Sequence, residues 1–132
     1  MPTTNHRLTD IARAAALALG LCMASAPHAA PSASARQEID YLLAYIGRSG
    51  CEFNRNGSWH DAKAAQDHVR TKYEFLLARD RINTAEDFIE MAATKSSVLF
   101  GKPYIVKCPV DPPVGSNQWL NNALARYRAL EP

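Results

Sequence analysis

The stretch "CEFNRNGSWHD" (residues 51–61) contains Asn56-Gly57 between two short segments in which apolar and polar residues alternate. An Asn-Gly pair in this setting predicts a two-residue hairpin turn, because both residues tolerate a positive φ. In the register that such a turn sets, Phe53 faces His60 across the hairpin. We therefore expect a β-hairpin whose first strand begins at the cysteine.

The first 35 residues predict export. "MPTTNHRLTDIAR" contains two arginines, "AAALALGLCMA" (residues 14–24) is apolar, and "SAPHAAPSASA" supplies the small residues that a signal peptidase requires. We expect a signal peptide over residues 1–29, with cleavage between 26 and 35 and Ala29 as the central site. A membrane anchor is disfavoured because the apolar run is much shorter than the roughly 20 residues needed to span a bilayer. Lipidation of Cys22 is disfavoured by the bulky Leu21 before it.

Loss of that segment would leave two cysteines, Cys51 and Cys108. In an oxidising compartment they have one intramolecular pairing available, so we expect a disulfide. The bond would join the start of the hairpin to the end of "PYIVKC" (residues 103–108), which requires the two strands to be antiparallel. Two cysteines without histidines at ligand spacing do not predict a zinc site, and we expect neither a metal nor a cofactor.

Apolar residues at helical spacing predict about four helices. Asp61, Thr84 and Ser116 are the expected N-caps of the last three, and Asp87 completes a capping-box arrangement with Thr84. "DPPVGS" (residues 111–116) is typical of a turn. The sequence thus predicts a single α+β domain over residues 37–130, in which a three-stranded antiparallel sheet (the hairpin plus one late strand) packs against the helices.

The charge of the exported chain is nearly balanced. Without residues 1–29, 13 Lys and Arg side chains remain against 12 Asp and Glu. Such a surface has no general attraction for phosphate backbones, so nucleic-acid binding is disfavoured. We expect an envelope ligand or an envelope protein as the partner, and no stable membrane span once the signal is removed.

"TKSSVLFGKPY" (residues 94–104) combines hydroxyls and lysines. It is not a phosphate-binding P-loop, since the first glycine of that motif is absent and no Ser or Thr follows Lys102. A serine hydrolase is the alternative function: Ser96 or Ser97 would be the nucleophile, activated by Lys95, Lys102 or His68. A structural account is simpler, with both serines ending a helix and a glycine permitting a bend.

Two histidines remain in the exported chain, His60 and His68. Their spacing matches no known metal signature. We expect His60 to pack beside Phe53 and His68 to lie on the surface of a helix. The "NRNG" tip offers the guanidinium of Arg55, which could bind a carboxylate or a phosphate.

Three segments resemble the YfeK-like family of small exported proteins of Gram-negative bacteria, a domain of unknown function. They are "FNRNG" (residues 53–57), "RINTAEDFIEMAATKSS" (residues 81–97) and "GKPYIVK" (residues 101–107). The resemblance covers residues 37–128 and implies a periplasmic location. It brings no catalytic residue and does not require the cysteine pair, so the disulfide is predicted from this chain alone.

The favoured interpretation is a non-enzymatic binding or accessory protein for an envelope component. Its basis is a group of polar residues in two separate segments, which could form one basic, hydroxyl-rich surface if the hairpin turn and the 94–104 segment meet. The candidate ligand-binding residues are Arg55, Asn56, Glu86, Lys95, Ser96, Ser97, Lys102 and Tyr104.

Overall fold

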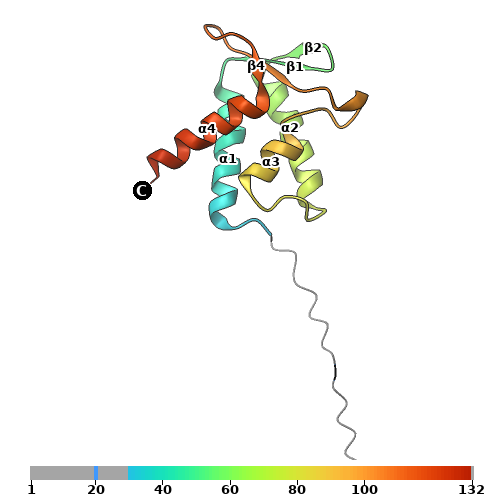
Figure 1. Ribbon diagram of the computed structural model, residues 1–132, viewed down its shortest axis with the longest axis vertical. Coiled ribbons are helices and arrows are strands. Elements are labelled where there is room, and N and C mark those ends of the chain that lie inside the picture. Colours follow the sequence, from blue (N-terminus) through green and yellow to red (C-terminus); the bar gives the residue numbers. More distant parts are fainter. Residues whose placement is uncertain (1–19, 21–29, 132) are drawn as a thin grey trace, which may run out of the picture.

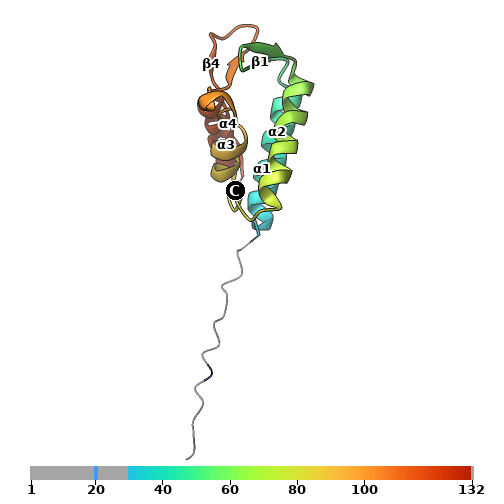
Figure 2. The same ribbon diagram turned by 90° about the vertical axis from the view of Figure 1, so that its right-hand side faces the viewer.

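The computed structural model describes residues 20 and 30–131, so the predicted signal peptide lies, apart from residue 20, outside the described residues. The described chain forms four helices in two layers, with a small sheet across one end of both (Figures 1 and 2). The helices are α1 (Ala33–Arg48), α2 (Ala62–Leu77), α3 (Ala85–Ala92) and α4 (Ser116–Leu130), with a short 3₁₀ turn, η1 (Leu99–Gly101). The strands are β1 (Glu52–Arg55), β2 (Ser58–His60), β3 (Ile105–Lys107) and β4 (Val114–Gly115).

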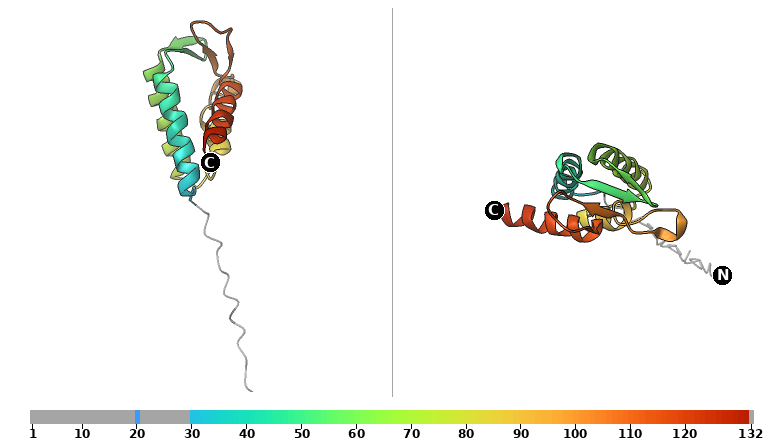
Figure 3. Two further views of the ribbon diagram at one scale, coloured as in Figure 1. Left: turned by 90° about the vertical axis from the view of Figure 1, so that its left-hand side faces the viewer. Right: turned by 90° about the horizontal axis from the view of Figure 1, so that it is seen from above.

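Helices α1 and α2 form one layer, and α3 and α4 form the other (Figure 3). The core lies between the layers and beneath the sheet, where Phe53 and Val106 face the helices. The largest wholly buried side chains are Phe88, Ile39, Leu42, Ile46, Ile82, Ile89, Leu120 and Val106. This arrangement confirms the α+β class. Among the described residues, no helix is long and apolar enough to cross a membrane.

The sheet has four antiparallel strands in the order β2-β1-β3-β4, not the three that the sequence predicts. Val114 pairs with Val106 and Gly115 with Ile105, so part of "DPPVGS" is a strand rather than a turn. A two-residue strand is too short to carry a period-two pattern, which is why the sequence did not reveal it.

The hairpin forms in the predicted register, with Phe53 opposite His60. Asn56 and Gly57 both have positive φ, as the two-residue turn requires. Cys51 and Cys108 form a disulfide with their Cα atoms 4.3 Å apart, and β1 and β3 are antiparallel, as expected from the pairing.

Of the three helix starts predicted from the sequence, two are confirmed and one is wrong. Asp61 and Thr84 cap α2 and α3 as predicted, and Thr84 forms the capping box with Asp87. Ser116 does not cap α4: Gly115 is the N-cap, and the buried Ser116 hydroxyl donates to the Ala93 carbonyl instead. Helix α1 begins at Ala33, so the folded domain starts before the predicted residue 37.

Candidate functional site

An outer cleft of about 540 Å³ lies where the hairpin turn, α2 and the 94–104 segment meet. The cleft is lined by cationic, hydroxyl-bearing and aromatic side chains from these three parts of the chain. They are Arg55, Asn56, Ser58, His60, His68, Thr71, Lys72, Phe75, Ser96, Ser97, Val98 and Tyr104. None of these lining residues is acidic, so the formal charge of the lining is positive.

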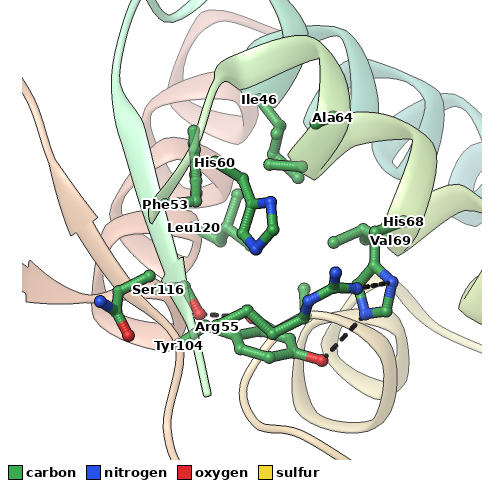
Figure 4. Close-up of a pocket in the computed structure, with 13 residues that line it drawn as sticks. Ile46, Phe53, Arg55, His60, Ala64, His68, Val69, Tyr104, Ser116 and Leu120 are labelled. Atoms are coloured by element: carbon green, nitrogen blue, oxygen red, sulfur yellow. Dashed lines mark hydrogen bonds between the residues drawn. The ribbon is translucent and has the colours of Figure 1, made fainter. Parts of the chain in front are cut away.

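A hydrogen-bonded chain of Arg55, His68 and Tyr104 forms one wall of the cleft (Figure 4). A guanidinium is always a donor, so Nδ1 of His68 must accept from Arg55. In the neutral imidazole the proton then resides on Nε2, which donates to the Tyr104 hydroxyl at 3.2 Å. Since that hydroxyl oxygen accepts this bond, its own O–H is left to donate to a ligand.

The electrostatics of the wall hold His68 in this neutral form. Burial lowers the pKa of His68 from its ordinary value of 6.5, and the positive charges of Arg55 and Lys72 lower it further. Burial likewise raises the pKa of the Tyr104 hydroxyl, which keeps its proton. At neutral pH the wall therefore presents one fixed cation and two neutral groups.

Lys72 supplies the second cation of the cleft. Its ammonium donates to the Lys95 carbonyl oxygen at 2.7 Å and lies 5.4 Å from the centre of the Tyr104 ring. Burial lowers the pKa of Lys72, and the nearby charge of Lys95 lowers it further. A bound anion would relieve both effects, because it favours the charged ammonium.

The 94–104 segment is a closed loop whose two ends pair with each other. The backbone N–H of Ser96 donates to the Lys102 carbonyl and that of Tyr104 to the Thr94 carbonyl, both at 2.9 Å. Gly101 within the loop has a positive φ of 67°, which confirms the expected bend. This closure places Ser96 and Tyr104 against the cleft.

A second, inner cavity of about 80 Å³ adjoins the outer cleft (Figure 4). Its lining comes from α1, α2, β1, β2, α4 and the segments preceding β3, and it is mostly apolar. The residues are Ile46, Phe53, Asn54, Arg55, His60, Ala64, Ala65, His68, Val69, Ala93, Tyr104, Ser116 and Leu120. Arg55, His60, His68 and Tyr104 line both spaces, so they form the boundary between them.

The structure brings most of the predicted residues together. Arg55, Asn56, Ser96, Ser97 and Tyr104 all line the outer cleft, although they come from segments about 40 residues apart in the chain. The hairpin turn and the 94–104 segment therefore do meet, as the favoured interpretation requires.

Three predicted residues lie elsewhere. Glu86 is in the first turn of α3, where its carboxylate pairs with Arg128 at 2.5 Å; this bond lowers the pKa of Glu86. Lys95 and Lys102 are exposed and do not line the cleft; their backbone carbonyls, rather than their ammonium groups, take part in the local hydrogen bonds. The charges of these three side chains are not part of the outer cleft.

Helix α2 contributes four residues to the outer cleft that were not predicted as ligand-binding residues. His68, Thr71, Lys72 and Phe75 stand at i, i+3, i+4 and i+7, which places them on one face of that helix. The spacing of these four residues is visible in the sequence, but polar residues at such spacing are also typical of a helix face that is exposed to solvent. His68 is thus part of the cleft wall and not the surface histidine that was predicted.

The contacts give no support to the serine hydrolase alternative. Both ring nitrogens of His68 are engaged by Arg55 and Tyr104. The Ser96 side chain is buried, and its hydroxyl oxygen accepts the backbone N–H of Val98 at 3.2 Å. Ser96 and Ser97 also do not end a helix, since α3 stops at Ala92. Among the described residues, no group of three or more His, Cys, Asp and Glu side chains could hold a metal ion.

Comparison with known proteins places the chain in a family. The DUF5329 profile, described as a family of unknown function, matches residues 33–128. The uncharacterized protein YfeK of Salmonella typhimurium (strain LT2) is 41% identical over 63 residues, which are 48% of this chain and 50% of that protein. This chain thus spans about half the length of the curated relative that it matches. No solved structure shows a significant match.

These matches confirm the family resemblance drawn from the three sequence segments. The profile match covers all four strands, the whole of α1, α2 and α3, and most of α4. It also includes every residue that lines the outer cleft. The chain belongs to the DUF5329 family of unknown function.

Proposed function

We propose that this protein is a periplasmic, non-enzymatic binding protein that holds an anionic envelope component in the outer cleft. The observation that carries the proposal is the pairing of two cations, Arg55 and Lys72, in a cleft whose lining contains no acidic residue. The export segment expected over residues 1–29 supports the location.

The donors of the cleft suit a carboxylate or a phosphate group. Arg55 uses a single N–H on His68, so most of its five donors remain for a bidentate contact. Lys72 uses one of three donors on the Lys95 carbonyl. The Tyr104 O–H and the hydroxyl of Ser97 add neutral donors to the lining of the cleft. An anion with two or three oxygens could engage several of these groups together.

Titration of the purified protein with inorganic phosphate and with acetate tests this function. Backbone amide NMR signals of Asn56 and Ser97 should shift, and the affinity should fall with added salt because the site is partly exposed. A charge-assisted hydrogen bond contributes about 1.5–3 kcal/mol, so Arg55→Gln or Lys72→Gln should weaken binding at least tenfold.

Lys63→Gln is the matched control. Lys63 lies on the same helix as Lys72, but it is exposed and pairs with Asp67 at 2.5 Å, away from the cleft. Its loss should change affinity by less than about twofold, as expected for a screened surface charge. The proposal fails if neither anion shifts the cleft signals, or if the control weakens binding as much as Lys72→Gln.

A further inference from the structure

The inner cavity has an apolar interior and a polar boundary on one side. Ile46, Phe53, Val69 and Leu120 form the interior, while the polar side chains shared with the outer cleft form the boundary (Figure 4). The space exists because Ala64, Ala65 and Ala93, from α2 and the end of α3, present only methyl groups to it. The cavity is thus built by small residues at the edge of the core, next to the outer cleft.

Water is a poor occupant of this cavity. A buried water needs two to four polar partners, and the donors that remain free, on Arg55 and Tyr104, lie at the boundary with the outer cleft. The Ser116 hydroxyl donates to the Ala93 carbonyl, and His68 is engaged at both nitrogens. Apolar cavities of this kind remain dry and take up hydrocarbon: one of about 150 Å³ binds benzene. A cavity of about 80 Å³ matches an aliphatic group of roughly three or four carbon atoms.

The two spaces are adjacent, since the same four residues line both. An anion held by Arg55 and Lys72 in the outer cleft would therefore have its substituent next to the inner cavity. Phe75 and Val98, which are half-exposed on the lining of the cleft, extend the apolar surface further outward.

We propose that the ligand is amphipathic: its anionic group binds in the outer cleft, and a short hydrocarbon group attached to it fills the inner cavity. The inference rests on the proposed function, because it takes the anion site as given. It adds the class of ligand, a carboxylate or phosphate monoester that carries an aliphatic chain.

Two homologous series test the inference: straight-chain carboxylates from acetate to octanoate, and alkyl phosphates from methyl to octyl. A buried methylene is worth a factor of about four in affinity. The dissociation constant should therefore fall about fourfold per carbon over the first three or four carbons and then level off. The two series also show which anionic group the cleft prefers.

Cavity-filling variants localise the effect. Ala65→Leu should abolish the dependence on chain length and leave acetate and phosphate affinity within about twofold. Because Ala65 is buried, a leucine there can also destabilise the fold. Ala64 lines the same cavity at an exposed position of the helix, where leucine is tolerated, so Ala64→Leu provides a second test. Ala125→Leu, at an exposed position of α4 that lines neither space, is the control and should leave the chain-length dependence intact.

The results separate the two proposals. If acetate and phosphate bind in the cleft but affinity does not change with chain length, the amphipathic ligand is refuted and the anion site stands. If chain length matters equally in wild type and in both cavity variants, the hydrocarbon lies outside the inner cavity and the inference fails. If no member of either series binds, both proposals fail.

Discussion

Removal of the Cys51–Cys108 disulfide should destabilise the fold by about 4 kcal/mol. The bond closes a loop with a sequence separation of 57 residues, and the chain-entropy relation for a loop of that length gives this figure at 25 °C. A domain of this size has a total stability of about 5–15 kcal/mol. The loss is therefore a large share of the whole, and the reduced protein should keep about 1–11 kcal/mol of stability.

Thermal and urea unfolding of the wild type, Cys51→Ala, Cys108→Ala and the double variant measure this loss. At about 4–8 °C per kcal/mol for a domain of this size, the melting temperature should fall by roughly 15–30 °C. Each single variant removes the whole bond, so the two single variants and the double variant should lose nearly the same free energy. Wild type treated with a reducing agent is the control, because it breaks the bond without deleting a side chain.

Two outcomes would contradict this role of the disulfide. A melting temperature lowered by only a few degrees, with the bond shown by mass to be absent, would mean that the cross-link does not restrict the unfolded chain. Additive losses in the two single variants would mean that each cysteine stabilises the fold by its own packing and not through a shared bond.

Further predictions concern the cleft, a helix cap, the 94–104 loop and the chain start. Because the pKa of His68 is lowered in the folded state, His68 of the unfolded chain binds a proton at pH values just below 6.5, where His68 of the folded protein does not. The free energy of unfolding, measured by urea titration, should therefore be highest above pH 6.5 and decline as the pH falls. In His68→Gln the same profile should be flatter. Thr84→Ala removes the α3 cap and should cost about 1 kcal/mol in the same assay, whereas an unchanged midpoint would show that the cap is not needed. Phe100 is fully exposed and has a φ of 61°, a left-handed conformation that strains most residues other than glycine. Phe100→Gly should therefore raise or preserve the melting temperature, and a clear decrease would show that the backbone at this position is not strained. Pro31 is buried and Ser32 caps α1, so if the predicted signal peptide is removed, N-terminal sequencing of the mature protein should find a first residue no later than Pro31. A later start would show that the folded protein does not need the Ser32 cap.

Local signals explain what the sequence predicted well. The hairpin register followed from Asn56-Gly57 alone, because a two-residue turn fixes which residues face each other. The caps at Asp61 and Thr84 likewise depend on contacts within three residues of the chain. The antiparallel relation of β1 and β3 followed from the disulfide, which is itself a constraint between distant residues.

The parts that were missed depend on tertiary packing. Ser116 has the residue type of an N-cap, but its hydroxyl donates a hydrogen bond to the Ala93 carbonyl, which is distant in the chain, and Gly115 is the N-cap instead. Lys102 and Lys72 are equally basic in sequence, yet only Lys72 reaches the cleft, because the face of α2 that meets the 94–104 loop is set by the packing of whole helices. No local pattern distinguishes these alternatives.

The inner face of the sheet connects the fold to the site. Side chains alternate along a strand, so Phe53 and Arg55 project from the same face of β1. Across the ladder, Val106 pairs with Phe53 in the core, and Tyr104 lies two residues earlier, where it meets the cleft. On this face of the sheet, Phe53 and Val106 thus lie in the apolar core, and the residues two positions away, Arg55 and Tyr104, lie at the boundary of the cleft.

This geometry makes the site depend on strand register. A slip of one residue would turn Arg55 and Tyr104 to the outside and replace them with their neighbours. Two devices oppose such a slip: the Asn56-Gly57 turn at the cleft end of β1 and the disulfide at the other end. Each of these strand pairs has a ladder of three residue pairs, but only β1 and β2 are also joined by a tight turn. Loss of the disulfide should therefore loosen Tyr104 relative to Arg55 first. If the outer cleft binds anions as proposed, a folded protein that lacks the bond should therefore bind them more weakly even under conditions where its helices remain intact.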